Sequence, residues 1–295
     1  MRLYRLVAGT LLAAVIVLAG IDASLPGVSW LATTTPPESS FMRWTAERAG
    51  KSAGAYSVEP VGLEAISPWL VCAVLKSEDR MFFRHHGFDW VQVRRAAGRV
   101  ARGERTGGAS TLSQQLARNV FLTPERSALR KIREALLTDH LESALSKRRI
   151  LELYLNLAEW GDGTWGAEQA ARAYFGTPAS ELGPFEATFL ASLLPAPCAP
   201  LRDAQVRRQG IVQDRALRKL LAAGLLERAQ YERALVRGEA VRARLAAGEA
   251  PARALEETRS LGPAPGPSPS LQAVLSSECG LDAELADEAK AAGGD

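Results

Sequence analysis

The chain has 295 residues, a formal net charge of +3 and 47% hydrophobic residues, enough apolar material for one globular domain with extensions. The charge is uneven: residues 271–295 contain six acidic residues against Lys290, a net of −5, which leaves +8 on the rest. Such a basic body suits an anionic partner, for example phosphate groups or a lipid surface. The three cysteines lie far apart, which excludes common metal-binding spacings and disfavours a disulfide framework.

An apolar stretch follows Arg2 and Arg5 and ends at Asp22. A helix that continues to residue 25 has about the 20 residues needed to cross a bilayer, and arginines on its N-terminal side favour a cytoplasmic N-terminus. A cleaved signal peptide is the alternative, because the length and charge also fit one. We predict a cytoplasmic N-terminus at residues 1–5, a transmembrane anchor at residues 6–25 and a linker or juxtamembrane segment at residues 26–60.

The linker contains the sequence FMRW at residues 41–44. Its aromatic and apolar side chains around an arginine could lie on a membrane surface, or they could pack on the domain that follows. At the other end, residues 241–295 are rich in Ala, Pro and acidic residues, including GPAPGPSPS. Such a segment buries too little apolar surface to offset its ordering entropy, so we predict a disordered tail.

Between the two extensions, residues 61–240 show helical periodicity, and no run alternates for long like a strand. Ser67 followed by a proline predicts the start of a helix that ends near Glu78. Thr111 and Gln114 have capping-box spacing directly after two glycines. We therefore predict an all-α domain. The arginines of its last two predicted helices, at residues 203–222 and 227–237, form either a solvated face or a contact with anionic lipid.

Four segments occur in order: SEDRMFFRHHGFD (residues 77–89), GGASTLSQQLARN (107–119), RKIRE (130–134) and KRRILELYLNLAEWGDGTWGAEQAARAYFG (147–176). They resemble the peptidoglycan glycosyltransferases over about residues 65–235. The chain looks like the monofunctional, membrane-anchored kind, because no penicillin-binding domain follows. The resemblance implies a lysozyme-like helical glycosyltransferase domain with a smaller, membrane-associated jaw region, on the periplasmic side of the cell inner membrane.

The resemblance also implies the reaction: lipid II is polymerised into β-1,4-linked glycan strands with inversion at the anomeric carbon, and undecaprenyl diphosphate is released. The implied partners are lipid II, the growing glycan chain and membrane lipids, with other cell wall synthesis and division proteins as further candidates. Nucleic acid is not expected, because the basic residues lack interleaved aromatics.

By motif position, Glu78 matches the general base of the family and Glu134 its second glutamate. A carboxylate must take the proton of the attacking sugar hydroxyl, and positive charge must receive the departing diphosphate. Mg²⁺ or Mn²⁺ held near Glu134 is a candidate cofactor, and no nucleotide is expected. We expect both glutamates to face one groove. The predicted substrate-binding residues are Asp79, Ser110, Thr111, Gln114, Gln115, Arg118, Arg126, Arg130 and Lys131.

Plainer interpretations stay open. Glu78 could be a solvated cap at a helix end, and Glu134 could merely pair with Arg130 on the surface, a contact that contributes about 0.3–0.5 kcal/mol. His85 and His86 are predicted to be structural. A lysozyme or lytic transglycosylase is one alternative function, disfavoured because it needs no diphosphate site. A non-catalytic cell wall scaffold is another, disfavoured because the motif positions carry chemically competent residues.

Overall fold

The computed structural model describes residues 2–104, 110–125, 127–161, 163–197, 203–263 and 268–274. In this part of the chain the regular structure is helical, apart from one antiparallel bridge between Glu159 and Trp165, which confirms the predicted all-α class. The α-helices are α1 (Arg2–Ala23), α2 (Ser40–Arg48), α3 (Pro68–Glu78), α4 (Trp90–Ala101), α5 (Leu112–Phe121), α6 (Ala128–Ala144), α7 (Lys147–Leu157), α8 (Ala167–Phe175), α9 (Pro184–Leu193), α10 (Asp203–Ala222), α11 (Arg228–Ala246), α12 (Pro251–Glu257) and α13 (Leu271–Ala273). Short 3₁₀ helices are η1 (Ser29–Ala32), η2 (Leu63–Ala65), η3 (Ala179–Glu181) and η4 (Arg259–Leu261).

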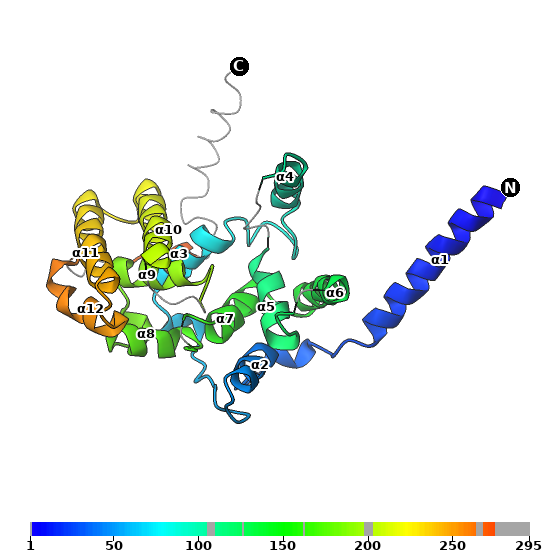
Figure 1. Ribbon diagram of the computed structural model, residues 1–295, viewed down its shortest axis with the longest axis horizontal. Helices are drawn as coiled ribbons and strands as arrows, with labels where there is room; N and C mark the ends of the chain where they lie inside the picture. Colours follow the sequence, from blue (N-terminus) through cyan, green and yellow to red (C-terminus); the bar gives the residue numbers. More distant parts are fainter. Residues whose placement is uncertain are drawn as a thin grey trace, which may run out of the picture.

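Helix α3 lies at the centre of the core. Its residues from Trp69 to Lys76 are all buried, as expected for a helix that is apolar on nearly every face. It packs on α9 and α10, while α5 packs on α6 and α7 (Figure 1). Cys72 on this helix is fully buried and serves as a small apolar core residue. The core therefore holds α3 rigidly, and with it Glu78 at the helix end.

Two helix starts follow from local sequence signals. The Ser67 hydroxyl oxygen accepts the backbone N–H of Trp69, and Pro68 occupies the first turn of α3. Thr111 and Gln114 form the predicted capping box at the start of α5, with each side chain accepting the backbone N–H of the other residue. The Ser67 cap and the capping box both satisfy N–H groups that have no partner within the helix.

Helix α1 extends away from the body of the molecule (Figure 1). Its apolar side chains, such as those of Leu11, Val15 and Ile16, are exposed. At its end, Asp22 Oδ1 lies 2.9 Å from His140 Nε2 on α6. Over the described ranges, no helix has both the length and the apolar character of a membrane span, so the predicted transmembrane anchor at residues 6–25 is not confirmed.

Helix α2 contains the FMRW sequence and packs on the domain. Met42 and Ala46 are fully buried, and the ring of Phe41 meets Trp165 edge-on at 5.3 Å between centroids. Of the two interpretations of this sequence, the structure supports packing rather than a membrane-surface patch.

The structure corrects the prediction of a disordered tail from residue 241. Helix α11 continues to Ala246, and α12 packs on α8 with Ala254 and Leu255 buried. Alanine has the highest helix propensity and a small side chain, so this composition allows a helix to lie close to α8. Residues 275–295 lie outside the described residues.

Candidate active site

Glu78 is the last residue of α3, and its side chain is half-buried. Gln115 Nε2 on α5 donates a hydrogen bond of 2.9 Å to Glu78 Oε2. Burial raises the pKa of the Glu78 carboxyl above its ordinary value, and the charge of Asp79 raises it further. The Gln115 hydrogen bond and the positive charges of Arg118 and Lys219 oppose this rise without cancelling it. The carboxylate is thus a stronger base than a solvated glutamate.

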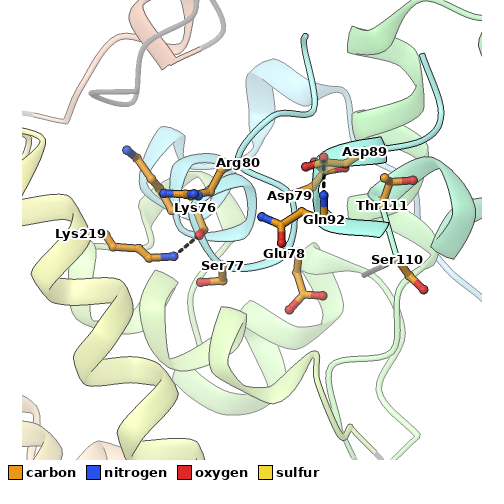
Figure 2. A pocket seen from close by; sticks show the side chains of 10 residues that line it. All are labelled: Lys76, Ser77, Glu78, Asp79, Arg80, Asp89, Gln92, Ser110, Thr111 and Lys219. Carbon is orange, nitrogen blue, oxygen red and sulfur yellow. Dashed lines mark hydrogen bonds between the residues drawn. The ribbon is translucent and has the colours of Figure 1, made fainter. Parts of the chain in front are cut away.

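Two hollows meet at Glu78. The first, a polar cavity of about 180 Å³, is shown in Figure 2, where the side chains of Glu78 and Asp79 point in different directions. The second, which we call the basic cleft, has a volume of about 420 Å³. The polar cavity is lined by Lys76, Ser77, Glu78, Asp79, Arg80, Asp89, Gln92, Ser110, Thr111 and Lys219. The basic cleft is lined by Ser77, Glu78, Ser110, Gln115, Arg118, Leu194, Pro195, Arg208, Val212, Arg215, Ala216 and Lys219.

The basic cleft draws its cations from two helices. Arg118 comes from α5, and Arg208, Arg215 and Lys219 come from α10. The Lys219 ammonium also donates to the carbonyl of Lys76 at 2.5 Å (Figure 2). The α10 cations are functional candidates that the sequence analysis left as a solvated or lipid-facing surface. Arg208 and Arg215 are seven residues apart and Lys219 is four further on; this helical spacing was the available signal that they share one face.

Asp79 is buried between the end of α3 and the start of α5. Its Oδ2 atom accepts the backbone N–H of Leu112 at 3.0 Å, and its Oδ1 atom lies 3.0 Å from His85 Nε2. A carboxylate at a helix N-terminus is favourably placed. Asp79 thus ties Glu78 to α5, and His85 holds the intervening loop as predicted. Substrate binding by Asp79, which also lines the polar cavity, stays a prediction.

The predicted polar residues at the start of α5 differ in position. Ser110 lines both hollows and Thr111 lines the polar cavity, although the Thr111 hydroxyl donates to the carbonyl of Gly87 at 2.6 Å. Gln114 is buried in the capping box and lines neither hollow. Gln115 lines the basic cleft and contacts Glu78. Only Ser110 and Gln115 therefore face the cleft.

Glu134 is 1% exposed and lines neither hollow at Glu78. Arg130 Nη1 lies 2.5 Å from its Oε2 atom, and Lys131 Nζ contacts its Oε1 atom. The three residues share one helix face at spacings of three and four, so the pairing is local. The expected common groove of the two glutamates is therefore not confirmed. Arg126, a predicted diphosphate contact, lies outside the described residues.

The surroundings of Glu134 do not fit the predicted divalent cation. Both carboxylate oxygens are already paired with cations. A metal ion of this kind prefers several oxygen ligands, yet in the described stretches of the chain no three His, Cys, Asp or Glu side chains gather into a possible metal site.

A base with a raised pKa that shares a cleft with four cations defines a class of enzyme. It activates a hydroxyl nucleophile and transfers a group from an anionic leaving group. Glu78 is held by a helix that is buried in the core, and its side chain lines an open basic cleft. A group transfer of this kind needs both features.

Comparison with known proteins identifies the family. The family model described as Transglycosylase matches residues 47–219, from α2 to the last cation of the basic cleft. A biosynthetic peptidoglycan transglycosylase of Azoarcus sp. (strain BH72) is 48% identical over 173 residues, 58% of this chain and 75% of the relative. One from Rhodospirillum centenum (strain ATCC 51521 / SW) is 48% identical over 181 residues, 61% and 78% of the two chains. One from Cronobacter sakazakii (strain ATCC BAA-894) is 44% identical over 171 residues, 56% and 70%.

The chain belongs to the biosynthetic peptidoglycan transglycosylase family. It is a peptidoglycan glycosyltransferase, an enzyme that polymerises glycan strands in cell wall synthesis, which confirms the resemblance found in the sequence.

Proposed function

We propose that this chain polymerises lipid II into β-1,4-linked glycan strands at the basic cleft, with inversion at the anomeric carbon and release of undecaprenyl diphosphate. The observation that carries this proposal is that the Glu78 carboxylate lines the same cleft as Arg118, Arg208, Arg215 and Lys219. The carboxylate suits the attacking sugar hydroxyl, and the cations suit the diphosphate.

Glu78 acts as the general base. Its carboxylate takes the proton of the sugar hydroxyl, whose oxygen attacks the anomeric carbon from the face opposite the diphosphate. The new carbon–oxygen bond forms as the bond from the anomeric carbon to the diphosphate breaks, and the proton remains on Glu78. A raised carboxyl pKa makes this transfer more favourable at neutral pH.

The four cations stabilise the departing diphosphate. Negative charge develops on it as the bond breaks, and preorganised positive charge at that position lowers the barrier. A diphosphate is already a good leaving group, so no general acid is required. No step is assigned to a divalent ion, because the oxygens of Glu134 are engaged by Arg130 and Lys131.

The test is purified full-length protein given lipid II with and without a chelator, and separately given finished glycan. We expect polymer from lipid II in both samples and no cleavage of glycan. Glu78→Gln should remove polymerisation and leave folding intact, while Glu232→Gln, an exposed matched change, should keep full activity. Cleavage of glycan without polymer would instead establish a glycan-cleaving enzyme, and turnover by Glu78→Gln would remove Glu78 from the role of base.

For location, we place the domain on the periplasmic side of the inner membrane, held there by α1. The support is the exposed apolar surface of α1 behind Arg2 and Arg5, which favour a cytoplasmic N-terminus. Other proteins of cell wall synthesis and division would meet the enzyme at this membrane. Deletion of residues 1–25 should move the protein from the membrane fraction to the soluble one. Alkaline extraction distinguishes a spanning helix, which resists it, from a surface-bound one, and a full-length chain in the soluble fraction would refute the proposal.

Helix α4 offers a second contact with lipid and corresponds to the predicted jaw. Trp90, Val91 and Val100 are exposed on it, with Arg94 and Arg95 also exposed, and the helix stands apart from the body in Figure 1. An exposed indole ring and aliphatic side chains beside arginines suit the interface between headgroups and acyl chains. Trp90→Ser should weaken binding of the variant lacking residues 1–25 to anionic vesicles, and unchanged binding would exclude α4 from lipid contact.

A further inference from the structure

Three side chains from three helices form one hydrogen-bonded chain that ends on Glu78. The hydroxyl of Tyr154 on α7 donates to Gln115 Oε1 on α5 at 3.0 Å. The amide of Gln115 in turn donates from Nε2 to Glu78 Oε2 at 2.9 Å. Tyr154 is 1% exposed and lines neither hollow at Glu78. It therefore reaches the base only through Gln115.

We propose that Tyr154 is a positioning residue for the general base: it locks the Gln115 amide in the one orientation that donates to Glu78. The proposal rests on the function assigned to Glu78 above. It also changes the predicted role of Gln115, because both ends of the amide are engaged within the protein instead of holding a sugar.

The chemistry of the three groups fixes the direction of the chain. An ionised carboxylate only accepts hydrogen bonds, an amide has one accepting and one donating end, and a tyrosine hydroxyl can do both. If the amide turned over, its oxygen would face the Glu78 carboxylate, and the buried Tyr154 proton would lose its acceptor. Both changes are unfavourable in a buried setting. Burial, and then the charge of Glu78, raise the pKa of Tyr154 well above its ordinary value, so the phenol keeps its proton.

The two carboxylate oxygens of Glu78 therefore have different roles. Oε2 is occupied by a fixed N–H donor, so Oε1 is the atom left to receive the proton of the sugar hydroxyl. The fixed donor also lowers the pKa of the carboxyl against the opposing effect of burial. Without the lock, the amide would spend part of its time turned away, and the pKa would rise further.

The test is Tyr154→Phe in the full-length protein, which keeps the buried ring and removes only the hydroxyl. We expect kcat to fall about tenfold, with KM little changed. The acid limb of the pH profile of kcat/KM should move to higher pH. The matched control is Tyr56→Phe. It removes a hydroxyl that accepts a hydrogen bond of 3.1 Å from Lys51 Nζ and lines neither hollow at Glu78, so it should leave the profile unmoved.

A double-mutant cycle separates positioning from packing. Gln115→Met should shift the acid limb in the same direction, and Tyr154→Phe added to it should cost nothing more, because the two residues act through one contact. A lower melting temperature with an unmoved acid limb, or additive losses, would overturn the proposal. If Tyr154→Phe does not fold, an unmoved acid limb in Gln115→Met overturns it as well. Loss of activity in Glu78→Gln together with an unmoved Tyr154→Phe profile would refute this lock alone and leave the proposed function standing.

Discussion

Arg130 Nη1 lies 2.5 Å from Glu134 Oε2, and Lys131 closes the other side of the same buried carboxylate. The glutamate therefore fixes two cations on α6. Glu134→Gln keeps the shape but removes the charge, which leaves Arg130 and Lys131 to repel each other. We expect a loss of stability of about 1–3 kcal/mol. The sequence-based prediction that Arg130 and Lys131 contact the anionic substrate adds an expected fall in kcat/KM of at least about tenfold, because neither cation is then held in position. Thermal unfolding and lipid II kinetics measure the two effects.

Glu168→Gln is the matched control for this change. Glu168 is also buried, accepts from an arginine four residues on, Arg172, at 2.8 Å, and lies on α8. It should lower the melting temperature and leave kcat/KM unchanged. Equal kinetic losses in both variants would show that Glu134 serves the fold and has no specific part in the reaction.

The raised pKa of Glu78 predicts the pH dependence of the reaction. Only the ionised carboxylate can accept a proton, so activity is present above the raised pKa and is lost as pH falls through it. Because Lys219 lowers this pKa through its charge, Lys219→Met should move the acid limb of kcat/KM to higher pH. A limb at the pH of an ordinary solvated glutamate, unmoved in Lys219→Met, would contradict the described surroundings of Glu78.

The same shift predicts a cost in stability. The folded state favours the protonated form of Glu78, so this residue destabilises the fold increasingly as pH rises from the unfolded pKa to the raised folded value, and constantly above it. Glu78→Gln removes a charge that burial disfavours. At pH 7.5 we expect its melting temperature to exceed that of the wild type by about 2–4 °C for each kcal/mol gained. Near pH 4 the two melting temperatures should be equal. An unchanged difference across this range would argue that the carboxylate is solvated.

Local signals account for what the sequence predicted well. The start of α3 at Ser67 and the capping box of Thr111 and Gln114 each depend on residues within one turn, and both are present. The ion pair of Glu134 with Arg130 is local in the same way and is present, but the carboxylate is buried and not on the surface as the plainer interpretation had it. The common groove expected for Glu78 and Glu134 required tertiary knowledge that no spacing contains.

The α10 cations show the opposite case. Their helical spacing was visible in the sequence, but it also fits a solvated face, and only the packing of α10 on α3 and α9 turns that face toward Glu78. The prediction of a disordered tail failed for a different reason. A composition typical of disorder also suits a helix that packs on α8, and whether the segment is ordered depends on whether the domain offers a surface for that helix.

The exposed arginines of the basic cleft should act on substrate binding through charge. Arg208→Gln and Arg215→Gln should each raise KM for lipid II about fivefold, equivalent to roughly 1 kcal/mol, with kcat less affected. The effect should shrink at high salt, because screening shortens the reach of exposed charges to about 8 Å at physiological ionic strength. Arg218→Gln is the matched control, since Arg218 is exposed on α10 but does not line the cleft. Equal effects from all three changes would indicate a general surface potential in place of a diphosphate site.

Arg237 tests whether the helices beyond the family match belong to the enzyme's fold. It is 3% exposed on α11, pairs with Glu186 on α9, and lies 4.1 Å from the centroid of the Phe185 ring. Its second guanidinium nitrogen donates to the carbonyl of Leu255. Because α11 also packs on α10, Arg237→Ala should destabilise the whole domain by about 2–4 kcal/mol and expose α12 to protease. Arg253→Ala, at a 72% exposed side chain that pairs with Glu257, should leave thermal unfolding unchanged, because exposed ion pairs contribute little. If Arg237→Ala left thermal unfolding unchanged while α12 became cleavable, the C-terminal helices would be an appendage that folds onto an already stable domain.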